Sequence, residues 1–246
     1  MKIVVIIPTY KEKDNIAGLT EALENEFAEM LRHSFYILFV DSNSPDGTGE
    51  VILRQQKKYG NIRLLAEREK KGLGAAYVAG MNYAMREMSA EALLEFDGDF
   101  QHDPRDIKKL VAELDKGYDY IIGSRYVPGG KIPEGWGWFR KSLSRYGGLF
   151  IKKMLSLPTR DNTSGFKLSR IDGFAEHMPL EEGKIFSLRH AYKIHLLYEM
   201  FRLGARVKEV PISFRERTEG GSKSTREDIW ESLKVVFKIR KQWRKS

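Results

Sequence analysis

The chain has 246 residues, of which 41% are hydrophobic and none is cysteine. This length allows one large domain or two small ones with a sizeable core. The absence of cysteine excludes a disulfide framework, a thiolate metal site and a cysteine nucleophile. The sequence contains no signal peptide pattern and no run of about 18 apolar residues typical of a transmembrane helix. We therefore expect a protein that is soluble or peripheral to a membrane.

Charge is unevenly distributed along the chain. Residues 1–124 carry 16 Lys and Arg against 21 Asp and Glu, whereas residues 125–246 carry 26 against 13, and the total is +8. A basic second half favours an anionic partner, such as phosphates, nucleic acid or an acidic membrane surface. The alternative is that these basic side chains are simply solvated on helix surfaces.

Apolar runs alternate with amphipathic stretches through the first half of the chain. The apolar runs, which predict strands, are residues 2–7, 35–40, 62–66, 92–96 and 120–123. The amphipathic stretches between and after them predict helices that end near residues 31, 59, 88 and 116. This alternation is typical of an α/β fold with a mostly parallel, Rossmann-like sheet and helices on both faces.

The alternation stops after Ser124. Residues 165–168 predict a short strand, residues 187–203 a helix, and residues 207–214 a strand that Pro211 places near an edge of the sheet. The last segment, 228–246, predicts a helix with an apolar stripe beside a row of lysines. One domain with a C-terminal elaboration is the simplest organisation.

Polar clusters follow four of the predicted strands, at residues 8–12, 41–46, 71–74 and 97–101. Because the carboxyl ends of parallel strands share one edge of the sheet, we expect these clusters to form one crevice. Its oxygen ligands would suit a divalent cation that also holds a phosphate. Asp103 and Pro104 instead predict a helix start, as N-cap and first helical residue. The sequence contains neither a dinucleotide-binding G-x-G-x-x-G nor a P-loop, and the glycine pair at 72 and 74 is also compatible with a structural turn.

Several motifs occur in a characteristic order along almost the whole chain. They are Pro8-Thr9-Tyr10-x-Glu12, Asp46-Gly47-Thr48, Lys71-Gly72-Leu73-Gly74, Asp97-x-Asp99-x-Gln101, Gly123-Ser124-Arg125, Asp161-x-Thr163-Ser164-Gly165-Phe166, Glu209-Val210-Pro211-Ile212-x-Phe214 and Arg217-x-x-Gly220-x-Ser222-Lys223. This pattern resembles the family 2 inverting glycosyltransferases, and the later motifs resemble their dolichyl-phosphate mannose synthase branch. The resemblance implies a single GT-A domain over residues 1–246, with a nucleotide-binding half (1–124), an acceptor and donor-sugar half (125–227) and a basic amphipathic helix (228–246).

The resemblance also implies an activity and its site. The expected reaction transfers a hexose from a nucleotide-sugar, with GDP-mannose favoured, to a dolichyl or polyprenyl phosphate at the cytoplasmic face of a membrane. The expected cofactor is Mg²⁺ or Mn²⁺. No nucleic acid is expected as a partner. The expected metal ligands are Asp97, Asp99 and Gln101. The expected substrate-binding residues are Pro8, Tyr10, Glu12, Val40, Asp41 and Ser42 for the nucleoside, Asp97, Gly98, Asp99 and Gln101 for the diphosphate, Lys71, Arg125, Arg217 and Lys223 for the rest of the donor, and Arg140 and Ser144 for the acceptor phosphate. The expected catalytic residues are Asp99, Arg140 and Arg217.

The chemistry of the expected acceptor bears on catalysis. A monophosphate has a second pKa of about 6, so it is largely dianionic at pH 7 and needs no general base. Asp161 is the nearest candidate base, but orientation of the turn that follows it is the favoured role. His102 is expected to be a loop side chain rather than a metal ligand, because hard cations prefer oxygen.

Two segments predict contact with a membrane surface. The tail helix and, more weakly, residues 146–157 combine apolar and basic stripes, the pattern of an interfacial anchor. Packing of both helices on the sheet with solvated lysines is the alternative. Trp136 and Trp138 lie among glycines, where a membrane-interface or acceptor-loop role competes with a core role.

The sequence also departs from the family pattern. Ser42 replaces an acid that often helps relatives to recognise the base, and UDP-glucose is therefore kept as the alternative donor. Some relatives have transmembrane helices that are absent here, so either the amphipathic segments or a separate membrane-anchoring subunit would hold the protein at the membrane. A basic nucleic-acid-binding protein and an inactive lipid-phosphate binder are rival functions, although the acidic strand ends have no use in the former.

Overall fold

The computed structural model describes residues 1–181, 183–216 and 226–243. Its strands are β1 (Lys2–Thr9), β2 (Ser34–Asp41), β3 (Ile62–Ala66), β4 (Ala92–Glu95), β5 (Tyr120–Ser124), β6 (Lys167–Arg170) and β7 (Val207–Pro211). Its α-helices are α1 (Lys13–Phe27), α2 (Thr48–Lys58), α3 (Leu73–Glu87), α4 (Ile107–Asp115), α5 (Trp138–Leu155), α6 (Tyr192–Arg202) and α7 (Arg226–Trp243). Two short 3₁₀ helices, η1 (Pro104–Asp106) and η2 (Ala175–His177), complete the elements.

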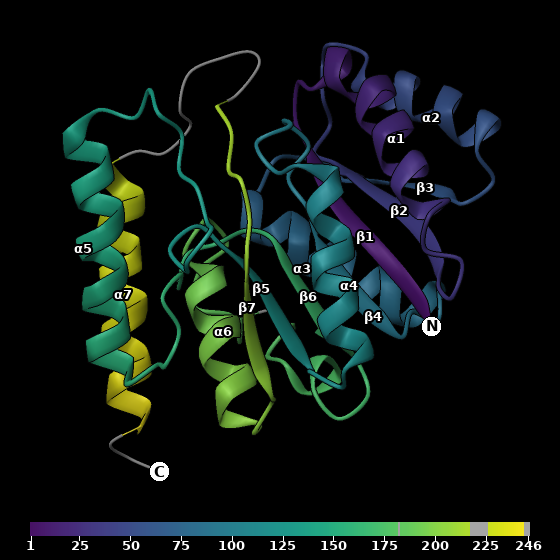
Figure 1. The fold of residues 1–246 in the computed structure, drawn as a ribbon. Helices are drawn as coiled ribbons and strands as arrows, with labels where there is room; N and C mark the ends of the chain where they lie inside the picture. The colour runs from purple at the N-terminus through teal and green to yellow at the C-terminus, as the bar shows by residue number, and fades with distance from the viewer. Residues whose placement is uncertain (182, 217–225, 244–246) are drawn as a thin grey trace.

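The strands form a mostly parallel seven-stranded sheet in the order β3-β2-β1-β4-β6-β5-β7 (Figure 1). β1 pairs in parallel with both β2 and β4, and its residues 3–7 are fully buried. A continuous apolar run of this kind is typical of a strand covered on both faces. β6 lies between β4 and β5 and is antiparallel to both.

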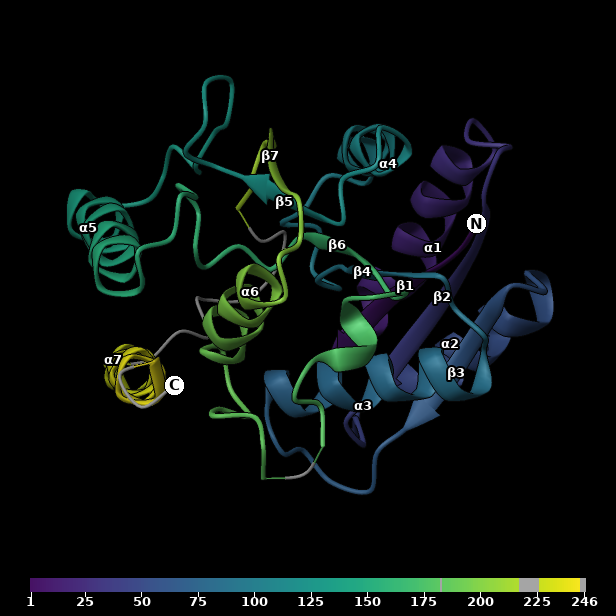
Figure 2. The ribbon, with the colours of Figure 1, turned by 90° about the horizontal axis from the view of Figure 1, so that it is seen from below.

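Helices cover both faces of the sheet, as alternating residues of each strand require. One face packs against α1, α2 and α4 through side chains such as Ile16, Ile52 and Leu110. The other face packs against α3 and α6 through side chains such as Met81 and Leu197. Beyond α6, α5 and α7 lie side by side at one end of the molecule (Figures 1 and 2).

The predicted fold class and the first five predicted strands are confirmed, with ends that differ by one or two residues. α1 ends at Phe27 rather than near residue 31, and α6 begins at Tyr192 rather than near residue 187. β7 ends at Pro211 and is an edge strand, as its proline predicted. The short strand expected at residues 165–168 occurs two residues later, as β6.

α3 packs unusually close to the sheet at Gly80. A Cβ atom placed on Gly80 would lie 2.5 Å from Cγ2 of Ile6 and 3.0 Å from Cγ2 of Val40, both in the sheet. A methyl group does not fit there without displacement of the helix. This close approach sets the distance between α3 and the strand ends that carry the site.

Gly80→Ala should therefore lower the free energy of unfolding by about 1–3 kcal/mol, since the added methyl overpacks the contact between α3 and the sheet. Gly147→Ala is the matched control, because Gly147 is also helical but nothing lies within 4 Å of the position that its added methyl would take. That control should gain about 0.5–1 kcal/mol from helix propensity. Urea unfolding at pH 7 measures both, and equal stability of the two variants would contradict the close packing.

Candidate active site

The loops that follow β1, β2 and β4 meet at the carboxyl edge of the sheet. The backbone N–H of Lys11 donates to Oγ of Ser44 over 3.1 Å, and that of Glu12 donates to Oγ1 of Thr48 over 3.1 Å. A Cβ on Gly98 would lie only 3.4 Å from the carbonyl oxygen of Pro8, so the acidic turn after β4 rests directly on the end of β1. The predicted convergence on one edge is therefore observed for three of the four clusters, those at residues 8–12, 41–46 and 97–101.

On the β2 side of this edge, two carboxylates are held by hydrogen bonds. Asp41 accepts from the hydroxyls of Thr9 over 3.0 Å and Ser44 over 2.6 Å. Ser42 donates from its hydroxyl to Oε2 of Glu67 over 2.6 Å. Glu67 therefore places a carboxylate beside the position where the sequence has Ser42 instead of a second acid.

The expected nucleoside residues differ in how they could reach a ligand. Tyr10 is half-buried, and the ammonium of Lys70 lies 3.8 Å from the centre of its ring. The Glu12 carboxylate accepts from Nδ2 of Asn15 over 2.8 Å. Pro8 is half-buried, whereas the Val40 side chain is fully buried in the core and can offer a ligand only its backbone.

Asp97, two residues after β4, is a carboxylate whose charge is balanced by side chains from other elements. Its Oδ1 accepts a 2.8 Å hydrogen bond from the Tyr77 hydroxyl on α3, and its Oδ2 lies 3.4 Å from Nε2 of His102. Burial alone would raise the pKa of the Asp97 carboxyl, but the Lys193 ammonium, His102 and Tyr77 hold that pKa far below its ordinary value. Asp97 is therefore ionised, and much of its charge is already balanced by the protein.

Asp99 and Gln101 belong to a tightly folded turn. Oδ1 of the buried Asp99 accepts from the backbone N–H of Gln101 over 3.1 Å. Phe100 between them has a φ of 59°, a conformation that a bulky side chain rarely adopts and that costs on the order of 1–3 kcal/mol. Gln101 also pairs with Arg215, accepting from its backbone N–H over 2.8 Å. The fold therefore maintains a strained backbone at this position.

These residues can be compared with what a divalent cation requires. Carboxylate and amide oxygens are the hard donors that Mg²⁺ and Mn²⁺ prefer, and Asp99 and Gln101 fit that chemistry. Across the part of the chain that the structure describes, no three His, Cys, Asp or Glu side chains form a group that could hold a metal ion. Asp97 fits less simply than Asp99, because a hydroxyl and two basic groups already surround its carboxylate.

Arg125 and Asp161 form a buried, two-pronged ion pair beside the edge. Nε and Nη2 of Arg125 each donate to the Asp161 carboxylate over 2.7 Å, and the Arg125 backbone N–H donates to it over 3.0 Å. The Asp161 side chain is fully buried, and that of Arg125 is 9% exposed. Burial would raise the pKa of Asp161, but the guanidinium and the hydrogen bonds lower it below its ordinary value. Asp161 thus orients Arg125, whereas the sequence favoured orientation of the turn at residues 164–166.

The expected acceptor residues lie at the start of α5. Ser144 and the Tyr126 hydroxyl share a 2.5 Å hydrogen bond, which links α5 to the residue next to Arg125. Arg140 is exposed and its guanidinium lies 4.0 Å above the ring of Trp136. Trp136 itself is buried against Phe214, so its role is packing, whereas Trp138 is 79% exposed.

Of the remaining expected residues, the structure describes Lys71. Lys71 is 61% exposed and lies 3.7 Å from the Glu69 carboxylate. Gly72, with a φ of 123°, and Gly74 allow close approach of the Leu188 and Arg189 backbone, so the glycine pair has a structural purpose. Arg217 and Lys223 lie outside the residues that the structure describes.

Four residues of the edge were not predicted as site residues from the sequence: Glu67, Tyr77, His102 and Lys193. His102 was expected to be an ordinary loop side chain, yet it is 2% exposed and packs against the rings of Phe96, Phe166 and Phe214. Tyr77 and Lys193 lie within helices, where a single sequence carries no signal for them. Glu67 directly follows β3, and this position at the carboxyl end of a strand was the one sequence signal that could have indicated a site residue.

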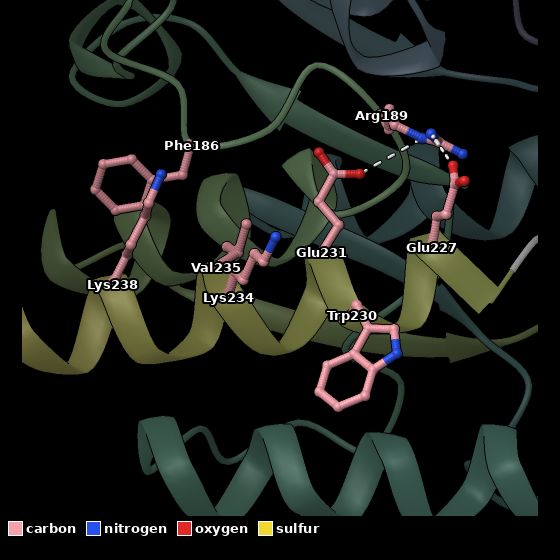
Figure 3. Close-up of a pocket in the computed structure, with 8 residues that line it drawn as sticks. All are labelled: Phe186, Arg189, Glu227, Trp230, Glu231, Lys234, Val235 and Lys238. Atoms are coloured by element: carbon pink, nitrogen blue, oxygen red, sulfur yellow. Dashed lines mark hydrogen bonds and ion pairs between the residues drawn. The ribbon is translucent and has the colours of Figure 1, made fainter.

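A pocket of about 560 Å³ lies elsewhere, along α7 (Figure 3). It is lined by Phe186, Arg189, Glu227, Trp230, Glu231, Lys234, Val235 and Lys238. Nη1 of Arg189 lies 3.0 Å from the Glu227 carboxylate, and its Nε lies 3.5 Å from that of Glu231. Since these acids already satisfy the arginine, the pocket offers less positive charge than its residues suggest.

Comparison with known proteins relates the chain to a family. The pattern described as "Glycosyl transferase family 2" matches residues 4–178. The polyprenol monophosphomannose synthase of Mycolicibacterium smegmatis is 33% identical over 239 residues, which cover 96% of this chain and 84% of that protein. The undecaprenyl-phosphate mannosyltransferase of Micrococcus luteus is 34% identical over 223 residues, which cover 91% and 87%. The dolichol-phosphate mannosyltransferase of Pyrococcus furiosus is 32% identical over 247 residues, which cover 98% and 64%.

Solved structures agree on the fold. The mannosyl-3-phosphoglycerate synthase from Rubrobacter xylanophilus superposes with a TM-score of 0.68 at 15% identity, covering 100% of this chain and 76% of that one. Residues 1–349 of TarS from S. aureus, in complex with UDP-GlcNAc, superpose with a TM-score of 0.62 at 17% identity, covering 96% and 65%. At these identities the likeness establishes the GT-A type of fold alone.

The Arg125–Asp161 pair gives a test that separates orientation from base catalysis. Asp161→Asn leaves a buried guanidinium without its counter-charge, so the free energy of unfolding at pH 7 should fall by about 3–5 kcal/mol. Because folding lowers the pKa of Asp161, the contribution of this carboxylate is present above the unfolded value of about 4 and is lost at lower pH. The gap between wild type and variant, measured by urea unfolding, should therefore shrink below about pH 4.

Asp172→Asn is the control, because Asp172 is exposed and follows the end of β6. Its effect should stay within about 1 kcal/mol. Lost turnover with unchanged stability of Asp161→Asn would instead support a role as base.

Proposed function

The chain belongs to glycosyltransferase family 2 and is a glycosyltransferase, and we propose that it transfers mannose from GDP-mannose to a polyprenyl or dolichyl phosphate. The observation that carries the proposal is the meeting of Asp97, Asp99 and Gln101 with the Arg125–Asp161 pair around one sheet edge. The names of the relatives supply the sugar and the lipid phosphate.

Enzymes of this family generally depend on a divalent metal. We propose that Asp99 and Gln101, with Asp97, hold a Mg²⁺ or Mn²⁺ ion together with the donor diphosphate. When bound, such an ion stabilises negative charge on phosphate oxygens. The hard oxygen donors of Asp99 and Gln101 support this assignment.

The protein's own cations would serve the leaving group. As the bond from the sugar to the diphosphate breaks, negative charge grows on the β-phosphate, and preorganised cations stabilise that charge. Arg125 is held rigidly by Asp161, which fixes the direction of its guanidinium. Arg217 and Lys223 are proposed for the same phosphates, and Arg140 and Ser144 for the acceptor phosphate.

Attack on the sugar would not require a basic side chain. A lipid monophosphate is largely dianionic at pH 7, so its oxygen is already a nucleophile. Asp161 is committed to Arg125 and is fully buried, which leaves it without access to an acceptor. Direct in-line attack inverts the anomeric centre, so an α-linked donor would give a β-linked mannosyl lipid.

The surfaces of α5 and α7 support work at a membrane. Most of the large apolar side chains that are exposed among the described residues lie on these two helices: Trp138, Phe139, Leu143, Tyr146, Leu149, Phe150, Ile229, Trp230 and Phe237. Basic residues alternate with them, and each could add about 1 kcal/mol of attraction to anionic lipid. No helix in the described ranges is long and apolar enough to cross a membrane. We propose peripheral binding through this surface at the cytoplasmic face, with a separate membrane-anchoring subunit as the alternative.

The donor is tested with a panel of nucleotide-sugars and a short polyprenyl phosphate, with Mg²⁺, with Mn²⁺ and with chelator. We expect kcat/KM with GDP-mannose to exceed that with UDP-glucose at least about tenfold. Asp99→Ala should lower turnover on the order of 100-fold or more, while Asp115→Ala, at the C-terminal end of α4, should not. Turnover with UDP-glucose and none with GDP-mannose would refute the mannosyl assignment, and normal activity of Asp99→Ala in cells would favour an inactive lipid-phosphate binder.

Membrane binding is tested by sedimentation with vesicles that contain anionic lipid. Replacing Trp138, Phe139 and Trp230 together by Ala removes large exposed apolar area, and the vesicle-bound fraction should fall at least about tenfold. Leu31→Ala is the matched control, because Leu31 is 88% exposed but follows α1, away from the two helices. Equal binding of the triple variant and the control would contradict this membrane surface.

A further inference from the structure

Lys193 is a buried ammonium at the edge of the sheet, and the proposed reaction has not yet given it a role. It lies in the first turn of α6 and is 7% exposed. Among the residues that the structure describes, no hydrogen-bond acceptor or carboxylate lies within bonding distance of its Nζ. A buried cation without a direct partner is costly, so its retention calls for an anion that approaches it.

The ammonium points at the acidic turn. A Cβ placed on Gly165 would clash with Nζ of Lys193 and would lie 3.1 Å from Oδ2 of Asp97, so both atoms border the same small space. The absence of a side chain at residue 165 leaves room for the Lys193 ammonium beside Asp97. Lys193 is close enough to lower the pKa of Asp97, yet it does not form a direct ion pair with it. The cation therefore lies beside the turn that is expected to hold the donor diphosphate.

The backbone around Lys193 reinforces this polarity. α6 has no side-chain cap at its start, so its first N–H groups give that end of the helix a partial positive charge. The backbone of Lys193 is held as well, because Nζ of the fully buried Lys167 donates to the Lys193 carbonyl oxygen over 3.1 Å. Arg125 adds a further positive charge near Asp97.

We propose that Lys193 binds the diphosphate of the nucleotide donor directly, as a cation supplied by the protein beside Asp97. The inference rests on the proposed function and adds a binding residue to it. The ammonium donates to a phosphate oxygen and balances part of the charge that a divalent ion would otherwise balance alone. Nucleotide binding therefore keeps a component that does not require metal.

The test is calorimetric titration of GDP and of UDP into the whole protein, once with chelator and once with Mn²⁺. Lys193→Gln keeps the length and a hydrogen-bond donor but removes the charge, and it should raise Kd in chelator about tenfold or more. The ratio of Kd without metal to Kd with metal should rise in this variant. Lys193→Arg keeps the charge and should restore binding in chelator to within about threefold of wild type.

Lys116→Gln, an exposed lysine that follows α4, is the control and should leave Kd unchanged in both conditions. Equal Kd in chelator for wild type and a folded Lys193→Gln would overturn the inference alone. A wild type that binds neither GDP nor UDP under any condition would overturn the proposed function and the inference with it. If Lys193→Gln does not fold, amine labelling of wild type in chelator decides: GDP should slow labelling of Lys193 but not of Lys116, and equal rates would refute the proposal.

Discussion

The balance of charge around Asp97 is the constraint on which the rest of the edge depends. A carboxylate that is mostly buried must be matched by donors or cations, or it will take up a proton. The partners of Asp97 come from three separate elements: Tyr77 from α3, His102 from the loop after β4, and Lys193 from α6. Their positions depend in turn on close packing, since Gly80 lets α3 approach the sheet and Gly165 leaves room for the Lys193 side chain. The burial of this carboxylate therefore constrains how these three elements pack at the edge of the sheet.

A second buried polar network lies beneath the first and supports it. Glu95, on β4, accepts a 2.6 Å hydrogen bond from the Tyr192 hydroxyl, and the ring of Tyr192 stacks on that of Tyr77 at 5.4 Å. Burial raises the pKa of Glu95 and lowers that of Lys167, the latter to about 8, because each charge is costly in the core. These groups connect the middle of the sheet to the start of α6 and to the backbone of Lys193. Polar networks of this kind hold their members in one arrangement only when they are well satisfied.

Much of the fold and the first half of the site could be predicted because their signals are local. Apolar runs mark the strands, and the acids after β4 and the cap formed by Asp103, which accepts from the Arg105 backbone N–H over 3.1 Å, follow from neighbouring residues. A short strand was predicted here, but the place of β6 between β4 and β5 and its antiparallel direction could not be, because its partners are distant in sequence. Lys193 and His102 were not predicted as site residues for the same reason, because their burial depends on segments that are distant in sequence. The glycine neighbours of Trp136 were a misleading signal, since Phe214, far along the chain, supplies the contact that buries it.

The reversed direction of β6 has a consequence for how such an edge can diversify. In a purely parallel sheet, only segments that leave a strand reach the carboxyl edge, so every site residue must follow a strand. β6 runs the other way, and the segment that enters it, with Asp161 and Gly165, arrives at the same edge. Asp161 and Gly165 therefore lie on a segment that enters a strand, whereas the acidic turn lies on a segment that leaves one. A change in the segment that enters β6 can therefore alter how Arg125 is held while the sequence of the acidic turn stays the same.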